Sequence, residues 1–124
     1  DEYHGLAIFE AIRTSITPVH GLVMGTAMSM AAIILQAATK RMITKNSMLM
    51  VHYGSMSLNV DAKDVKPWAK ENSRYNSWME HVFLKRMRQA DKKMTLKKVQ
   101  EILKTDCLLT ATQAKALGLV DEIV

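Results

Sequence analysis

A serine flanked by small residues is the first feature of this sequence that could do chemistry. Ser29 stands two positions after Ala27 and two before Ala31, between a strand-like and a helix-like stretch. A sharp turn that exposes a nucleophile needs small side chains at these flanks, because larger ones would collide across the turn. A helix beginning here also directs its first amides, including that of Met30, towards an oxyanion formed nearby. A serine that begins a helix can equally be only a cap, so the motif alone leaves both interpretations open.

A serine hydroxyl needs a general base to act as a nucleophile at neutral pH. His52 closes the apolar stretch 48–51, and the ends of strands are where α/β folds place reactive groups. The other histidines stand in less suitable contexts, near the chain end, on the strand before the serine and in a Trp- and Met-rich helix: His4, His20 and His81. We therefore favour His52 as the base.

An acid must orient the imidazole of such a pair. Asp106 stands between a predicted helix and the apolar stretch 107–109, a setting that could turn its carboxylate inward. The remaining aspartates lie in more exposed-looking contexts: Asp61, Asp64, Asp91 and Asp121. The pattern alone does not separate Asp106 from Asp121.

The elements that must position these residues alternate between helix and strand. Helical spacing of apolar residues and capping signals predict helices at 5–14, 29–39, 61–90, 95–103 and 111–117. Short apolar runs bounded by turn residues predict strands at 19–24, 41–43, 48–52 and 119–124. The segment 54–60 reads as extended. This order indicates an α/β fold in one domain, 1–124, without internal repeats.

Composition narrows the classes of protein further. The 124 residues are 48% hydrophobic, as in a packed domain, and carry a net charge of +5. Most of the excess lies between Lys85 and Lys104, where no aromatic residues suited to nucleic acid are interleaved; we interpret it as a solvated helix face. The single cysteine, Cys107, excludes an intramolecular disulfide and fits a reducing, cytoplasmic compartment. We expect no membrane span, no metal site and no cofactor.

Four stretches of the sequence together resemble one known family, the ClpP proteolytic subunits of Clp proteases. The matching stretches are Gly-Leu-Ala-Ile-Phe-Glu-Ala-Ile at 5–12, Gly-Thr-Ala-Met-Ser-Met-Ala at 25–31, Asn-Ser-Met-Leu-Met-Val-His at 46–52, and 106–123, which begins Asp-Cys-Leu-Leu-Thr-Ala and ends Gly-Leu-Val-Asp-Glu-Ile. They occur in the family's order along nearly the whole chain.

The resemblance implies a crotonase-like β-α superhelix whose long "handle" helix lies in a handle region of about 54–92. It also implies a homo-oligomer of stacked heptameric rings that cleaves peptides and unfolded polypeptides, the latter supplied by an AAA+ unfoldase. No membrane or nucleic-acid partner is implied.

The resemblance also assigns site residues. It makes Ser29 the nucleophile, His52 the base and Asp106, rather than Asp121, the orienting acid of a serine endopeptidase. The oxyanion hole would be built from backbone amides at Met30 and at Asp1, which follows the position of the family's Gly-Gly segment.

The sequence departs from the family in two places. The segment 53–60 lacks the family's Gln-Pro pair and its glycines, as in phage-encoded or other atypical relatives. The family's Gly-Gly segment and first strands would precede Asp1, so we expect half an oxyanion hole and weak activity from these residues alone. The alternatives are an inactive ring subunit, another crotonase-fold enzyme acting on acyl thioesters, and a basic nucleic-acid-binding module.

Overall fold

The structure is a computed structural model that describes residues 2–124. Within these residues the chain forms five α-helices, one 3-10 helix and six short strands. The helices are α1 (Glu2–Arg13), α2 (Met30–Leu35), η1 (Ala62–Asp64), α3 (Val65–Ala90), α4 (Leu96–Leu103) and α5 (Ala111–Ala116). The strands are β1 (His20–Val23), β2 (Thr26–Met28), β3 (Lys40–Ile43), β4 (Met48–Val51), β5 (Cys107–Thr110) and β6 (Glu122–Ile123).

The strands form two small sheets. One has the order β1-β3-β6 and is entirely parallel; the other has the order β2-β4-β5, with β2 parallel to β4 and β5 antiparallel to it. The connections from β1 to β2 and from β3 to β4 are too short to return a parallel strand to the same sheet, so the chain steps into the other sheet each time. The predicted α/β class is confirmed, with a long helix beside two sheets.

The predicted elements are present, with three corrections. The strands β2 and β5 were not predicted, because each is only three or four residues long and carries little periodic pattern. The strand predicted at 119–124 is reduced to Glu122–Ile123, since Leu119 and Val120 are buried in the core instead. The helix predicted at 29–39 is shorter and spans only Met30–Leu35.

Local signals set the ends of the last two helices. The hydroxyl of Thr95 accepts a hydrogen bond from the amide of Lys98 and caps α4. Thr110 and Gln113 form a reciprocal capping box at the start of α5. Gly118, with a φ of 75°, follows α5 in the left-handed conformation that glycine adopts readily.

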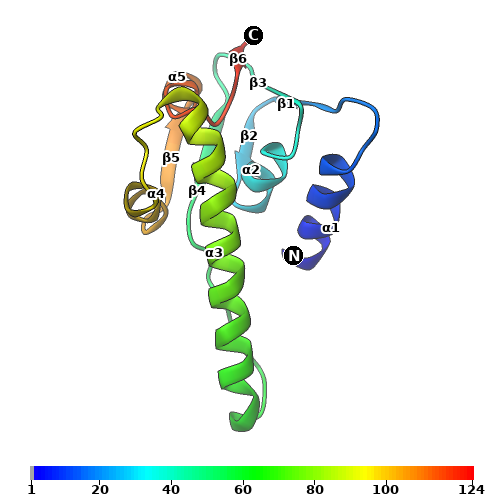
Figure 1. Ribbon diagram of the computed structural model, residues 1–124, viewed down its shortest axis with the longest axis vertical. Helices are drawn as coiled ribbons and strands as arrows, with labels where there is room; N and C mark the ends of the chain where they lie inside the picture. Colours follow the sequence, from blue (N-terminus) through cyan, green and yellow to red (C-terminus); the bar gives the residue numbers. More distant parts are fainter. Residues whose placement is uncertain (1) are drawn as a thin grey trace.

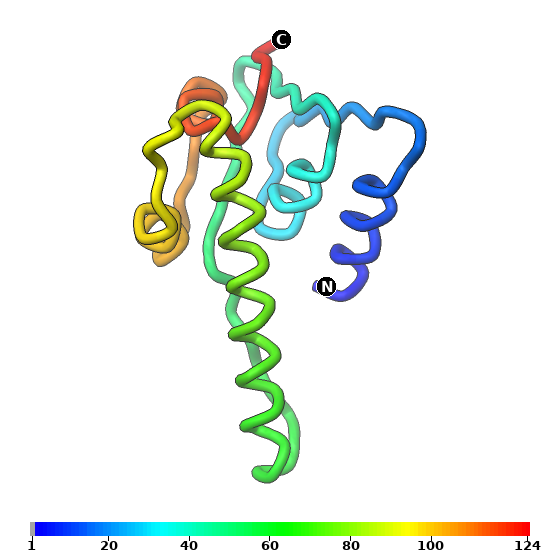
Figure 2. The backbone as a smooth tube through the Cα atoms, viewed as in Figure 1, coloured from blue at the N-terminus to red at the C-terminus, as the bar shows by residue number. Residues whose placement is uncertain are grey.

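The two halves of the long helix α3 differ in how deeply they are buried. Every buried residue of α3 lies between Met79 and Met87, where the helix packs against the sheets and α4. Its first half projects from the body of the molecule, and the extended segment 54–60 runs back along it (Figures 1 and 2).

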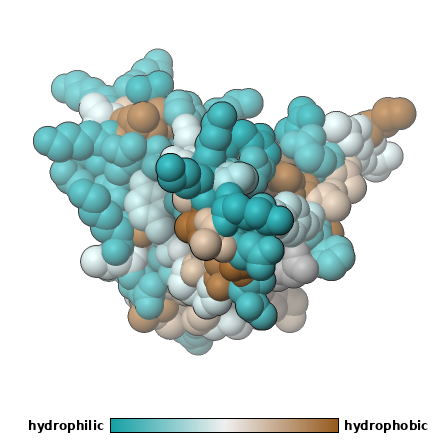
Figure 3. Space-filling model, turned by 90° about the horizontal axis from the view of Figure 1, so that it is seen from below, coloured by the Kyte–Doolittle hydropathy of each residue, from teal (hydrophilic) through white to brown (hydrophobic). Residues whose placement is uncertain are grey.

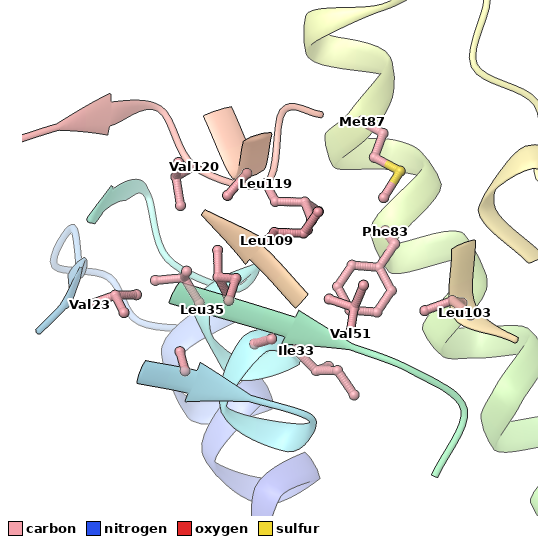
Figure 4. Packing of buried hydrophobic residues seen from close by; sticks show 14 of the residues in the cluster. Val23, Ile33, Leu35, Val51, Phe83, Met87, Leu103, Leu109, Leu119 and Val120 are labelled. Carbon is pink, nitrogen blue, oxygen red and sulfur yellow. The ribbon is translucent and has the colours of Figure 1, made fainter. Parts of the chain in front are cut away.

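The core lies between this second half of α3 and the strands. In Figure 4, Phe83 of α3 points towards Val51 at the end of β4, and Leu103 and Leu109 belong to the same cluster. Val51 is fully buried, so the strand that ends just before His52 is fixed by packing.

Candidate active site

Ser29 occupies a strained turn between β2 and α2. Its backbone has φ 53° and ψ −119°, and it is the only non-glycine residue with positive φ among residues 2–124. Such a conformation costs about 1–3 kcal/mol and persists only where the surrounding structure imposes it. Here the amide of Ser29 donates to the carbonyl of Met50 at 2.9 Å, which ties the turn to β4. This is the geometry of a nucleophile elbow.

His52 connects Ser29 to Asp106. Its Nε2 lies 3.0 Å from the Ser29 Oγ, and its Nδ1 lies 2.9 Å from the Asp106 Oδ1. With the ring proton on Nδ1, His52 donates to the carboxylate, and Nε2 is left to accept from the serine hydroxyl. The three residues that the sequence singles out are therefore brought into one chain of hydrogen bonds.

One sheet explains why three distant residues meet. Ser29 follows β2 and His52 follows β4; since these strands are parallel, both residues leave the sheet at the same edge. Asp106 precedes β5, whose antiparallel pairing brings its beginning to the end of β4, with Val51 opposite Cys107.

Asp121 lies in the other sheet and has a different partner. Its carboxylate accepts hydrogen bonds from the backbone amide, Nε and Nη2 of Arg41, whose side chain is 1% exposed. Partial burial alone would raise the pKa of Asp121, but its hydrogen bonds from Arg41 and the charges of Arg41 and Arg86 outweigh it, and the pKa is lowered. The sequence pattern alone did not separate Asp106 from Asp121. In the structure the Asp106 carboxylate lies beside His52, and the Asp121 carboxylate lies beside Arg41.

The other candidate residues are elsewhere. His20 is exposed on β1, and the exposed His81 lies on α3 with its Nδ1 2.7 Å from the carbonyl of Ser77. Met30 is the first residue of α2, and its amide has no partner within the helix. The predicted contribution of Asp1 falls on a residue outside the described range.

The side chain of Met30 packs closely against α1. A Cβ atom at Gly5 would lie 2.2 Å from the Cγ of Met30, so a larger residue there would force the side chain of Met30 to move. The Oη of Tyr75 also lies 4.0 Å from the Sδ of Met30. Tyr75 in turn lines a hollow in the surface.

This hollow, of about 450 Å³, lies between the start of α1, the segment 54–60 and the first half of α3. Its lining is largely apolar and includes Leu6, Met56, Leu58, Trp68 and Tyr75. Figure 3, seen from the free end of α3, shows hydrophobic surface among hydrophilic side chains on this side of the molecule. The hollow is open to solvent and could hold an apolar group; Ser29 and His52 do not line it, and its link to the elbow is Tyr75, which contacts Met30.

Two residues beside the site were not predicted from the sequence. Tyr53 follows His52, and its hydroxyl donates to the buried Glu80 of α3. The available signal was the position of Glu80, at helical spacing from the buried Phe83, Leu84 and Met87, where an apolar residue is expected.

Within residues 2–124, no cluster of three or more His, Cys, Asp or Glu side chains is arranged to hold a metal ion. In the same range, none of the helices has the length and apolar character needed to span a bilayer.

Comparison with known proteins identifies the family of this chain. The family model of the Clp protease matches residues 2–124, and the chain belongs to this family. A relative from Deinococcus radiodurans, an ATP-dependent Clp protease proteolytic subunit, is 28% identical over 124 residues, covering 98% of this chain. The chain spans 58% of the length of that relative. The two small sheets and the long helix are consistent with the fold of the family.

Proposed function

We propose that this chain is the catalytic part of a serine endopeptidase, with Ser29 as nucleophile, His52 as general base and Asp106 as the orienting acid. The observation that carries the proposal is the contact of 3.0 Å between the Ser29 Oγ and the His52 Nε2, made at a strained turn. A hydroxyl held by an imidazole in this way is the usual arrangement for acyl transfer.

The reaction follows from these positions. His52 accepts the proton of Ser29 through Nε2 while the Oγ attacks the peptide carbonyl, and Asp106 stabilises the imidazolium that forms. The same nitrogen then protonates the leaving amine, and an acyl-enzyme remains on Ser29. Water, deprotonated by His52, hydrolyses this ester and restores the serine. The amide of Met30 would donate to the oxyanion, and that of Asp1 would be its second donor.

The substrate we propose is an extended peptide or unfolded polypeptide. The apolar hollow, whose Tyr75 contacts Met30, would receive a hydrophobic side chain of the peptide, with Trp68 and Tyr75 on its α3 side. We further propose that residues 1–124 act as one catalytic domain with a handle region at 54–92. This domain would work within a homo-oligomeric ring complex fed by an AAA+ unfoldase, as the resemblance to ClpP implies.

A fluorophosphonate probe tests the proposed chemistry directly, because it reacts with an activated serine and needs no peptide substrate. We expect labelling on the peptide that contains Ser29, detected by mass spectrometry, and none in Ser29→Ala. His52→Ala should lower the labelling rate about 10⁴-fold or more, since the base is lost.

The matched controls are His20→Ala and His81→Ala, which remove exposed imidazoles away from the serine. Both should be labelled at the rate of the unchanged protein. An intact, folded protein that is not labelled at Ser29 would refute the proposal and favour an inactive ring subunit.

A further inference from the structure

The orientation of His52 is not accounted for by Asp106 alone. The side chain of Asp106 is 78% exposed, whereas that of His52 is 22% exposed. Solvent screens an exposed carboxylate and leaves its side chain mobile, so such a contact fixes a partner only weakly. Some other contact must hold the imidazole close to the Ser29 Oγ.

The backbone on both sides of His52 is tied down. Val51, before it, is paired with Cys107 in the β4–β5 ladder. Tyr53, after it, donates its amide hydrogen to the carbonyl of Leu103, the last residue of α4, at 2.7 Å. His52 is thus the single residue between two attachments to different elements.

The side chain of Tyr53 extends the second attachment to α3. Its hydroxyl donates to the Oε1 of Glu80 at 2.5 Å, and the Nε2 of Gln100, on α4, donates to the Oε2 of Glu80 at 3.0 Å. Burial first, then the hydrogen bond and charge of Glu80, raise the pKa of Tyr53, so its hydroxyl keeps the proton that it donates. Both oxygens of the Glu80 carboxylate are therefore occupied.

This carboxylate stands where packing alone would favour an apolar side chain. Glu80 is 8% exposed, and its neighbours Met79 and Phe83 are each 1% exposed. Both of its hydrogen-bond donors are uncharged, so neither forms a salt bridge with this buried polar group. If all the partners were replaced by apolar residues of similar shape, stability would be nearly unchanged on general grounds, so stability alone does not explain this group of polar residues.

We propose that Tyr53, Glu80 and Gln100 form a clamp that positions His52 for proton transfer with Ser29. The three are positioning residues, since they act through the backbone of residue 53 and touch no reacting atom. The inference rests on the proposed function for its effect on rate, but the clamp itself can be tested without any activity.

The main variant is Tyr53→Phe, which removes one hydroxyl and keeps the ring and the amide bond to Leu103. We expect fluorophosphonate labelling of Ser29 to slow about tenfold, because small displacements of a base are costly in rate. With a peptide substrate, kcat should fall while KM stays the same. Ile43→Val, in the β1-β3-β6 sheet, is a mild core truncation and should change neither.

Two further variants separate positioning from stability. Tyr53→Phe combined with Glu80→Met removes the hydroxyl and the carboxylate together. Only the partly exposed Gln100 then loses a partner, so the loss of stability should be small. If labelling of this stable double variant is nonetheless slow, the clamp acts on the site. Glu80→Gln keeps an acceptor for the Tyr53 hydroxyl and should restore most of the rate lost in Glu80→Met.

Amide hydrogen exchange and NMR test the clamp without depending on activity. In Tyr53→Phe, the amide of residue 53 should exchange about tenfold faster relative to that of Leu49 in the core, and the ring resonances of His52 should shift. If the unchanged protein is not labelled at all, the proposed function fails, and the exchange and NMR measurements alone test the clamp. Unchanged exchange and unchanged ring resonances in Tyr53→Phe would overturn the inference, as would labelling at the parental rate in a protein that is labelled.

Discussion

The two sheets of this protein each have an aspartate next to a strand, and the two carboxylates have opposite surroundings. Asp106, before β5, is largely exposed and contacts the Nδ1 of His52. Asp121, before β6, receives three donors from the buried Arg41. Arg41 also donates to the side chain of Gln36 and to other groups nearby, so this ion pair is part of a larger polar network.

The difference suggests a division of roles: the Asp121 carboxylate stabilises the fold, whereas the Asp106 carboxylate would take part in the proposed chemistry. A buried guanidinium without its counter-charge is costly, so the carboxylate that neutralises it contributes to the free energy of unfolding. An exposed carboxylate contributes little to stability, and its contact with an imidazole matters when that imidazole becomes charged during a reaction. Exchanging each carboxylate for an amide tests this division.

The largest effect on stability is expected from Asp121→Asn. The substitution keeps the shape of the side chain but leaves Arg41 buried without a counter-charge. Loss of a partner from a fully buried pair costs about 3–5 kcal/mol. We expect about 2–3 kcal/mol, because the side chain of Asp121 is 38% exposed and partly screened. Urea denaturation measures this loss.

In the same variant, Asp121→Asn, the rate of labelling at Ser29 should be unaffected, in contrast to the stability. The folded fraction of Asp121→Asn should react with the fluorophosphonate probe at the rate of the unchanged protein, since Arg41 and Asp121 lie in the other sheet. A rate that falls while the protein remains folded would show that the two sheets are not functionally separate.

A smaller effect, and on rate instead of stability, is expected from Asp106→Asn. Loss of a buried triad aspartate costs about 10⁴-fold in serine peptidases. For the exposed Asp106 we expect only about 10- to 100-fold slower labelling of Ser29, because the clamp at Tyr53 retains much of the orientation of His52. The free energy of unfolding should stay within about 0.5 kcal/mol of the parent. A stability loss as large as that of Asp121→Asn would contradict the comparison.

The residues that the sequence predicts best are those whose role depends on neighbours close in the chain. The small residues around Ser29 and the apolar strand before His52 are visible within a few positions, and the structure has both features where they were predicted. The helix caps at Thr95 and the glycine end of the last helix at Gly118 are equally local.

The features that the local pattern left open or missed depend on residues far apart in the chain. Asp106 and Asp121 differ in their partners, which lie 54 and 80 positions away, and no periodic pattern reports such distances. The same holds for Tyr53 and Glu80, which are 27 positions apart. The short strands β2 and β5 exist because β4 lies between them and pairs with both, so their own sequences carry little of the signal.

The smallest predicted effect is the pH dependence of the Asp121 contribution. The pKa of Asp121 is lowered in the folded protein, so its stabilisation is complete above the unfolded pKa of about 3.9 and is lost as the pH falls through the lower folded value. The stability difference between the parent and Asp121→Asn should therefore be constant from neutral pH down to about pH 5 and shrink below pH 4. Urea titrations of both proteins measure this difference, from which the other acidic groups cancel because the two proteins share them. A difference that is unchanged down to pH 2.5 would mean that the charge of Asp121 does not stabilise the fold, and that the amide variant is destabilised through its hydrogen bonds with Arg41 alone.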